Sequence, residues 1–244
     1  MAVSNPIRIV PPHGDALAAP VSAAHLSYRG GPLLQAAQVF VFFWGTAWEG
    51  PQAALVQQIN QFFDFILTSA LLDQMAEYSV AGISIGHGSR TGALILSTDP
   101  PAAIADSDLQ TLIQQEIAND PAVPQPTANT LYFVFLPPGV TVTVDGGASC
   151  STLCGYHSAI NGKIFYAVMP YPDCTGCVGT HTVADALTVA SSHELCEAIT
   201  DPVPGQGWYD DRSGEIGDIC AWKTKRLGSF MVQLEWSNRA GQCI

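Results

Sequence analysis

A histidine and two glutamates lie close together in a segment of the sequence that is otherwise mostly small and apolar. His193, Glu194 and Glu197 form the pattern His-Glu-x-x-Glu within ADALTVASSHELCEAIT, residues 184–200. On a helix, His193 and Glu197 would lie on one face, one turn apart, with Glu194 about 100° away around the axis. In zinc proteases, side chains at i and i+4 bind the metal and the intervening glutamate is the general base. Here a glutamate takes the place of the second histidine.

A motif this short also arises by chance on the solvated face of an ordinary helix. The neighbouring turns, however, contain no lysine or arginine that would pair with the carboxylates. Because burial of an unpaired carboxylate costs several kcal/mol, a divalent cation is the simplest compensation for these charges. We therefore expect a metal at His193 and Glu197, with Glu194 as the catalytic base.

A catalytic zinc site needs a third protein ligand and keeps one position open for water. The downstream segment GEIGDIC contains two candidates, Glu215 and Asp218, which follow Glu197 by 18 and 21 residues. Asp218 lies near Cys220, whose disulfide would hold it in place, whereas Glu215 could instead orient His193 without touching the metal. Zinc is the expected ion. Calcium is an alternative, because many of the candidate ligands are carboxylate oxygens.

Three further residues are candidate substrate-binding groups. His157, in CGYHS, is expected in a loop held by cysteines, where it could contact a substrate or an oxyanion; an ordinary hydrogen-bonded histidine is the simpler interpretation. Tyr209 could donate a hydrogen bond in the transition state, and Trp208 would line the cleft. His181 precedes His193 by twelve residues, so more than three helical turns would separate it from the metal.

The composition limits the classes of partner. The chain has 244 residues, enough for one large domain, and only 12% of them are charged, about half the usual share of ~25%. A net charge of −12 argues against nucleic acid and anionic membranes as partners. Since no apolar run reaches the ~18 residues of a membrane span, we expect a soluble protein. Its substrate would be a peptide or protein, more easily cationic or neutral than acidic. The sequence does not predict an oligomeric state.

Seven cysteines indicate an oxidising compartment. Their order along the chain gives three local pairs and one odd thiol: Cys150 with Cys154, Cys174 with Cys177, Cys220 with Cys243, and Cys196. We expect disulfides; the alternative is a structural zinc held by the first four of these cysteines. The first 30 residues lack the basic start and apolar core of a signal peptide, so secretion would depend on a signal that is not visible in this sequence.

Strands and helices are expected to alternate around the motif. Residues 1–30 are predicted to form an extended arm and residues 31–244 a single domain. Strands are predicted at 38–44, 81–85, 93–96, 130–136 and 163–169, and helices at 52–72, as two helices or one long one, at 108–118 and at 184–200. Asp106 or Ser107 would cap the helix at 108–118, and Asp201-Pro202 would end the helix at 184–200. The pattern predicts a three-layer, zincin-like α/β domain with a mixed twisted sheet and a metal-binding helix.

The order of several short segments resembles a known family. GGPLL, VFVFFWG, CSTLCGYHS, YAVMPYPDCTGC, SSHELCEAITDP, GWYDD, GEIGDIC and LEWSNRAGQC follow one another between residues 31 and 243, as in bacterial relatives of the plant Exordium, or phosphate-induced, proteins. The plant branch implies a secreted, wall-associated protein without established enzymatic activity, and the bacterial branch a secreted zincin-type protein. We thus expect a secreted zinc metallopeptidase. The alternative is a non-catalytic secreted binding protein with a structural or vestigial metal site.

Overall fold

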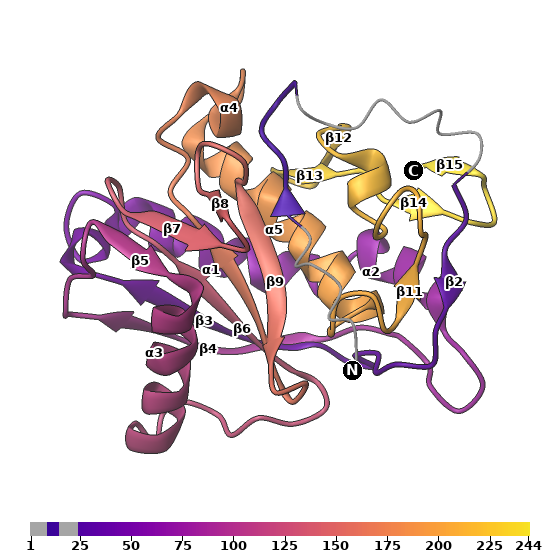
Figure 1. Cartoon of the computed structure of the whole chain (residues 1–244), viewed down its shortest axis with the longest axis horizontal. Helices are drawn as coiled ribbons and strands as arrows, with labels where there is room; N and C mark the ends of the chain where they lie inside the picture. Colours follow the sequence, from indigo (N-terminus) through magenta and orange to yellow (C-terminus); the bar gives the residue numbers. More distant parts are fainter. Residues whose placement is uncertain (1–8, 15–23) are drawn as a thin grey trace.

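The central feature of the computed structural model is a mixed β-sheet; the structure describes residues 9–14 and 24–244 (Figure 1). Its strands are β1 (Ile9–Val10), β3 (Gln38–Trp44), β4 (Ser89–Leu96), β6 (Thr130–Phe135), β9 (Gly155–Ile160) and β10 (Ile164–Met169). They lie in the order β1-β9-β10-β6-β3-β4. The strands β3, β4, β6 and β10 are parallel, whereas β9 and β1 extend the sheet antiparallel at one edge.

The inner strands are apolar on both faces, and each face contributes to a separate core. In β6, Leu131, Phe133 and Phe135 pack into one core, and Tyr132 and Val134 into the other. Strands β3 and β10 alternate in the same way. Because successive side chains of a strand point to opposite faces, a strand buried on both sides must be apolar throughout. The sequence VFVFFW follows this rule.

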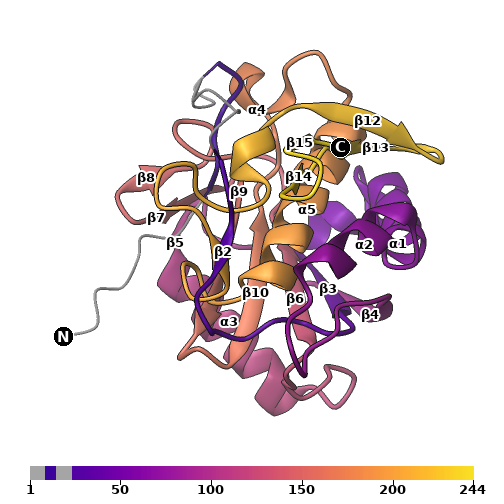
Figure 2. The same ribbon diagram turned by 90° about the vertical axis from the view of Figure 1, so that its right-hand side faces the viewer.

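Helices cover both faces of this sheet (Figures 1 and 2). The first core is closed by α1 (Ala53–Ile66), α2 (Ala70–Met75) and α5 (Val183–Thr200). The second is closed by α3 (Asp106–Asn119) and a small sheet of β5 (Ala103–Ala105), β7 (Thr141–Val144) and β8 (Gly147–Ala148). The α/β class predicted from the sequence is confirmed.

The C-terminal part packs on the outer side of α5 through short elements. These are β11 (Trp208–Tyr209), the 3₁₀ turn η4 (Asp218–Cys220), and the pairs β12 (Thr224–Leu227) with β13 (Phe230–Gln233) and β14 (Trp236–Ser237) with β15 (Gln242–Cys243). Strand β13 packs against α5. As a result, α5 lies between the main sheet and the C-terminal segment, so its side chains are enclosed on both sides.

Most predicted elements lie within three residues of the observed ones. The stretch 52–72 forms two helices, α1 and α2, β4 begins four residues before the predicted 93, and two further corrections are needed. Residues 81–85 do not form a strand: Gly82, at φ 83°, makes a tight turn closed by a single bridge between Val80 and Ile83. Helix α3 begins at Asp106, whose carboxylate accepts hydrogen bonds from two tyrosines instead of capping the helix. The carboxylate of Asp108 closes the N-terminus by accepting from the backbone N–H of Ala105.

Strand β9 was not predicted, and His157 lies on it and not in a loop. β9 and β10 form a hairpin around Asn161 and Gly162, at φ 53° and 66°. Positive φ at both positions is the geometry of a type I′ turn, for which Asn-Gly is the preferred pair. The signal was therefore present in the sequence, between the apolar runs GYHSAI and IFYAVM.

Three disulfides are present, but four cysteines pair differently from the local pairing expected. The bonds join Cys150 to Cys174, Cys154 to Cys177, and Cys220 to Cys243, while Cys196 is free and buried. The turn after β8 lies beside α4 (Thr175–Val178), so each cysteine of one segment faces a cysteine of the other. The bonded residues have Cα–Cα distances of 5.4 to 5.8 Å, which suit a disulfide. A zinc site at these cysteines is thereby excluded.

The described parts of the predicted N-terminal arm lie against the domain. Val10 and Leu26 are fully buried in the first core, and β2 (Ser27–Tyr28) pairs with β11. Residues 1–8 and 15–23 of the predicted arm lie outside the described residues. Among the helices of residues 9–14 and 24–244, none has the length and apolar character that a membrane crossing requires.

Candidate metal centre

Helix α5 carries the His-Glu-x-x-Glu motif into the interior of the protein. The hydroxyl of Thr182 caps its first turn by accepting from the backbone N–H of Asp185 at 3.1 Å. His193, Glu194 and Glu197 are all 0% exposed. The motif therefore does not lie on a solvated helix face, and its charges must be compensated inside the fold.

The first candidate ligand group consists of His193, Glu197 and Asp218. Nε2 of His193 lies 2.9 Å from Oε1 of Glu197. The same oxygen accepts a hydrogen bond from the backbone N–H of Asp218 at 3.1 Å. Ligand atoms of the three residues all lie within 4.8 Å of one another. Asp218 begins η4 and is partly exposed, so this group is the one that reaches toward solvent.

Glu215 belongs to a second candidate group, together with His157 and Glu197. Nδ1 of His157 lies 3.0 Å from Oε2 of Glu194 and 3.4 Å from Oε2 of Glu197. Nε2 of His157 lies 3.6 Å from Oε1 of Glu215. His157 and Glu215 are both 0% exposed. The two third-ligand candidates from the sequence are thus divided between two groups that share Glu197.

Two residues that sequence reasoning missed hold the His193 ring. Nε2 of Gln233 lies 2.8 Å from Nδ1 of His193 and donates to the carbonyl of Gly217 at 2.9 Å. Because Oε1 of Gln233 accepts from the backbone N–H of Trp222, the amide presents an N–H to Nδ1, and the neutral ring carries its proton on Nε2. A Cβ at position 217 would lie 2.8 Å from three ring atoms of His193, so only glycine fits there.

The charges of the second group influence one another strongly. Burial would lower the pKa of His157, but the carboxylates of Glu215, Glu194 and Glu197 outweigh this effect and raise it well above its usual range. Burial raises the pKa of Glu215 well above that of an ordinary glutamate, and the neighbouring Glu197 adds to the shift. Asp201 is compensated differently, because its carboxylate accepts hydrogen bonds from three backbone N–H groups of residues 205–207.

The polar atoms that face one another fit a divalent cation. Those without a hydrogen-bond partner are Oε1 of Glu194, Oε2 of Glu197 and both carboxylate oxygens of Glu215, and Nε2 of His193 faces only Oε1 of Glu197. Buried polar atoms are almost always hydrogen-bonded, so a cluster of this kind requires another source of compensation. Imidazole nitrogen together with carboxylate oxygen is a donor set that suits zinc and other first-row divalent ions.

The predicted substrate-binding residues Trp208 and Tyr209 have other described contacts. The indole N–H of Trp208 donates to the carbonyl of Tyr78 at 2.7 Å, and the two rings pack edge to face. The guanidinium of Arg29 lies over the ring of Tyr209, 4.4 Å from its centre. Neither residue belongs to the two ligand groups.

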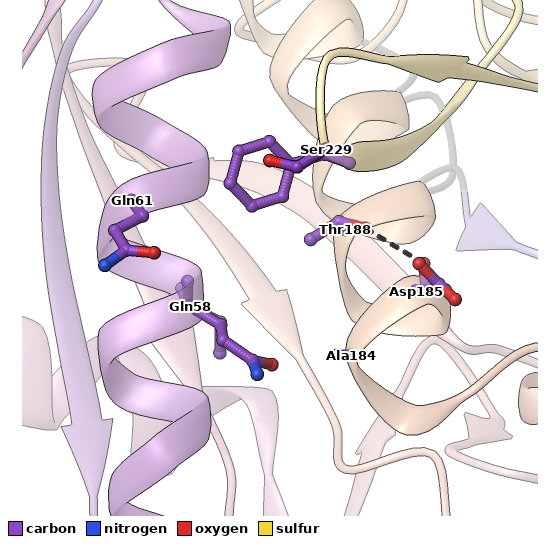
Figure 3. A pocket seen from close by; sticks show the side chains of 8 residues that line it. Gln58, Gln61, Ala184, Asp185, Thr188 and Ser229 are labelled. Carbon is purple, nitrogen blue, oxygen red and sulfur yellow. Dashed lines mark hydrogen bonds between the residues drawn. The ribbon is translucent and has the colours of Figure 1, made fainter.

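A pocket of about 320 Å³ lies between α1, the N-terminal half of α5 and the turn of the β12–β13 hairpin (Figure 3). Gln58 and Gln61 line it from α1, Asp185 and Thr188 from α5, and Ser229 from the hairpin. The hydroxyl of Thr188 donates to the backbone carbonyl of Asp185. None of the residues lining this pocket belongs to either ligand group.

No protein-family model matches the chain, and no curated protein matches it. Among solved structures, a chain from the one entitled "Structure of a chaperone-substrate complex" is similar at 16% identity and a TM-score of 0.33. The match covers 75% of this chain and 26% of the other, and a likeness this remote supports no argument about function. The class of the protein therefore rests on its own residues: it is a disulfide-bonded α/β protein with a buried cluster of histidines and carboxylates.

Proposed function

We propose that the protein is a secreted zinc-dependent hydrolase of zincin-like architecture, and specifically a metallopeptidase. His193, Glu197 and Asp218 would hold the metal, and Glu194 would be the general base. The observation that carries the proposal is the position of Glu194: it is fully buried beside both helix ligands and keeps Oε1 without a hydrogen-bond partner. A carboxylate oxygen left free next to a metal-ligand group is what a general base requires.

The chain's own residues orient this base. Nδ1 of His157 lies 3.0 Å from Oε2 of Glu194, which restrains one oxygen, while the other lies beside Gly155 of β9 without a hydrogen-bond partner. A bound zinc ion supplies Lewis acidity, which lowers the pKa of water and polarises a carbonyl oxygen. Glu194 would take up the proton released in this step and return it to the leaving amine.

Metal binding at Nε2 of His193 requires a change in its hydrogen bonds. In the structure Gln233 presents an N–H to Nδ1, so the ring proton is on Nε2. If Nε2 held the metal, the ring proton would have to be on Nδ1, and the amide of Gln233 would have to turn so that its oxygen accepts from Nδ1, exchanging its present hydrogen bonds with Trp222 and Gly217. Gln233 is accordingly the residue that would set the tautomer of His193.

The remaining support concerns location, architecture and substrate. Three disulfides are typical of proteins in oxidising compartments such as the extracellular space. The motif helix packs across β9 and β10, where the sheet changes from parallel to antiparallel, in keeping with the zincin-like arrangement proposed. The net charge of −12 favours cationic peptides over acidic ones.

Replacement of Glu194 tests the enzymatic proposal. Glu194→Gln keeps the shape of the side chain and the metal ligands but removes the base, so zinc content should be retained while peptide hydrolysis falls by roughly 10²- to 10⁴-fold. The exposed Glu49 provides a matched control, because Glu49→Gln should change neither quantity. Equal hydrolysis of a peptide library by wild type and Glu194→Gln, or no hydrolysis by the zinc-loaded wild type, would refute the proposal.

One observation favours the second candidate, a non-catalytic secreted protein with a structural metal. His193, Glu194 and Glu197 are completely enclosed, as ligands of a structural metal can be, whereas a catalytic metal keeps an open position. In that case the metal would contribute to folding, and its removal should lower the unfolding temperature without any hydrolysis being detected at full zinc occupancy.

A further inference from the structure

We propose that His157, Glu197 and Glu215 form a second divalent-cation position, which shares Glu197 with the His193 group. This goes beyond the proposed hydrolase, which needs only one metal. It depends on that proposal only in treating the His193 group as the first cation position. The two groups lie side by side in the same cluster, and Glu197 belongs to both.

The hydrogen bonds of His157 leave Nδ1 directed at carboxylates. Nε2 lies 3.0 Å from the backbone carbonyl of Asp201, and a ring nitrogen faces a carbonyl as an N–H donor. Nδ1 then faces Oε2 of Glu194 at 3.0 Å and Oε2 of Glu197 at 3.4 Å. A bare nitrogen among carboxylate oxygens is repulsive, so Nδ1 must either carry a proton or bind a cation. Donation of the second ring N–H to a backbone carbonyl is the usual arrangement of a metal-ligating histidine.

Glu197 presents one oxygen to each group. Oε1 lies 2.9 Å from Nε2 of His193 and accepts from the backbone N–H of Asp218. Oε2 faces His157 and has no hydrogen-bond partner. A carboxylate with its two oxygens divided in this way can bridge two cations, as in metal pairs separated by roughly 3.5–4 Å.

Glu215 provides the independent sign that a ligand is missing from the second group. It is 0% exposed, and neither of its oxygens accepts a hydrogen bond from a described N–H or hydroxyl group; its side-chain neighbour is the carboxyl group of Asp201. Asp201, which is also fully buried, has its carboxylate satisfied by backbone N–H groups, so burial here does not by itself leave a carboxylate unpaired. Ligand atoms of Glu215, His157 and Glu197 lie within 4.8 Å of one another, so one cation could contact all three.

The charge of the cluster also exceeds what one cation compensates. Glu194, Glu197 and Glu215 are fully buried, and Asp218 joins them at the partly exposed edge. One dication balances two of these carboxylates. Without a second cation, burial favours the neutral form of Glu215 by raising its pKa, whereas two dications would balance all four carboxylates in their ionised forms. One imidazole nitrogen with carboxylate oxygens suits zinc or manganese better than the soft ions that prefer sulfur.

Metal stoichiometry tests the second position. Protein freed of metal with a chelator is titrated with Zn²⁺ by calorimetry, and the retained zinc is measured by elemental analysis after gel filtration. Wild type should bind two equivalents and Glu215→Gln one. Glu49→Gln is the control, because Glu49 is exposed and belongs to neither ligand group; it should bind two. His157→Gln, expected to bind one, replaces Glu215→Gln if that variant does not fold.

Manganese gives a second readout. Two Mn²⁺ ions bridged by Glu197 should give an exchange-coupled electron paramagnetic resonance spectrum in the wild type, and Glu215→Gln should give that of an isolated ion. Binding of one metal equivalent by the wild type would overturn the second cation position. Binding of two equivalents by both Glu215→Gln and His157→Gln would overturn it as well. Neither readout depends on hydrolysis. If the wild type binds two equivalents of metal but hydrolyses no peptide, only the peptidase proposal fails. If it binds one equivalent and hydrolyses peptides, only the second cation position fails.

Discussion

Gly217→Ala should weaken zinc binding although residue 217 offers no side chain to the metal. The backbone of Gly217 is at φ −79° and ψ −39°, which alanine adopts without strain. The added methyl group, however, would lie 2.8 Å from Cγ, Nδ1 and Cε1 of His193, against ordinary contacts of 3.4 to 4 Å. The ring or the loop must therefore retreat by about 0.6 Å, which is larger than the roughly 0.2 Å tolerance of metal–ligand distances.

Two magnitudes follow from this displacement. Overpacking beside a rigid, buried ring costs roughly 1–3 kcal/mol of unfolding free energy. Misplacement of one metal ligand costs roughly 10- to 100-fold in metal affinity, by analogy with the loss of a residue that orients a ligand. Zinc affinity is measured by competition with a chromophoric chelator, and stability by thermal unfolding of the metal-free protein. Far-UV circular dichroism checks that the fold is retained.

Gly86→Ala is the matched control, because a Cβ at that position meets nothing within 4 Å and its φ is not in the left-handed region. It should leave zinc affinity unchanged and the unfolding free energy unchanged or slightly higher, since alanine restricts the unfolded chain. If Gly217→Ala binds zinc as tightly as the wild type, the His193 ring does not hold the metal in the position described, and the ligand assignment fails.

Two further predictions concern parts of the structure next to the metal centre. Burial raises the pKa of Glu235 well above its ordinary value, so its contribution to stability is present below the unfolded-state pKa and is lost as pH rises through the folded-state pKa. In the metal-free protein, the unfolding free energy of Glu235→Gln should match that of the wild type near pH 4 and exceed it increasingly toward pH 8. The gain should be about 1.4 kcal/mol for each pH unit between the unfolded-state and folded-state pKa. Equal unfolding free energies at pH 8 would contradict this prediction. Peptide mapping without reduction should give the bonds Cys150–Cys174 and Cys154–Cys177 and one free thiol in the denatured protein; bonds within each local pair would contradict the observed packing.

Elements with a strong local signal were predictable from the sequence. Residues 38–44 and 130–136 are unbroken apolar runs, and β3 and β6 follow them almost without shift. The motif helix was predicted at 184–200 and begins at Val183, because its N-terminal cap and the Asp201-Pro202 stop are both local features. The presence of disulfides followed from the number of cysteines. The Asn161-Gly162 turn also had a local signal, but it was overlooked.

Other features depend on contacts between distant parts of the chain. The pairing of Cys150 and Cys154 with Cys174 and Cys177 depends on how two turns pack side by side, which no spacing along the chain encodes. Gln233 reaches His193 across 40 residues. In the sequence it is an ordinary polar residue of a short strand, with nothing to mark it as a contact of the metal centre.

The sequence by itself determined which residues could bind a metal: the spacing of His193 and Glu197 places them on one helix face, and GEIGDIC supplies two more carboxylates. Only the tertiary structure decided how these residues are grouped. Packing of β9 against α5 brings His157 to the carboxylates, and Glu215 belongs to its ligand group, whereas Asp218 belongs to that of His193. The physical reason is that helical spacing is set by local hydrogen bonds, whereas the meeting of α5, β9 and the C-terminal segment is set by burial of the apolar core they share.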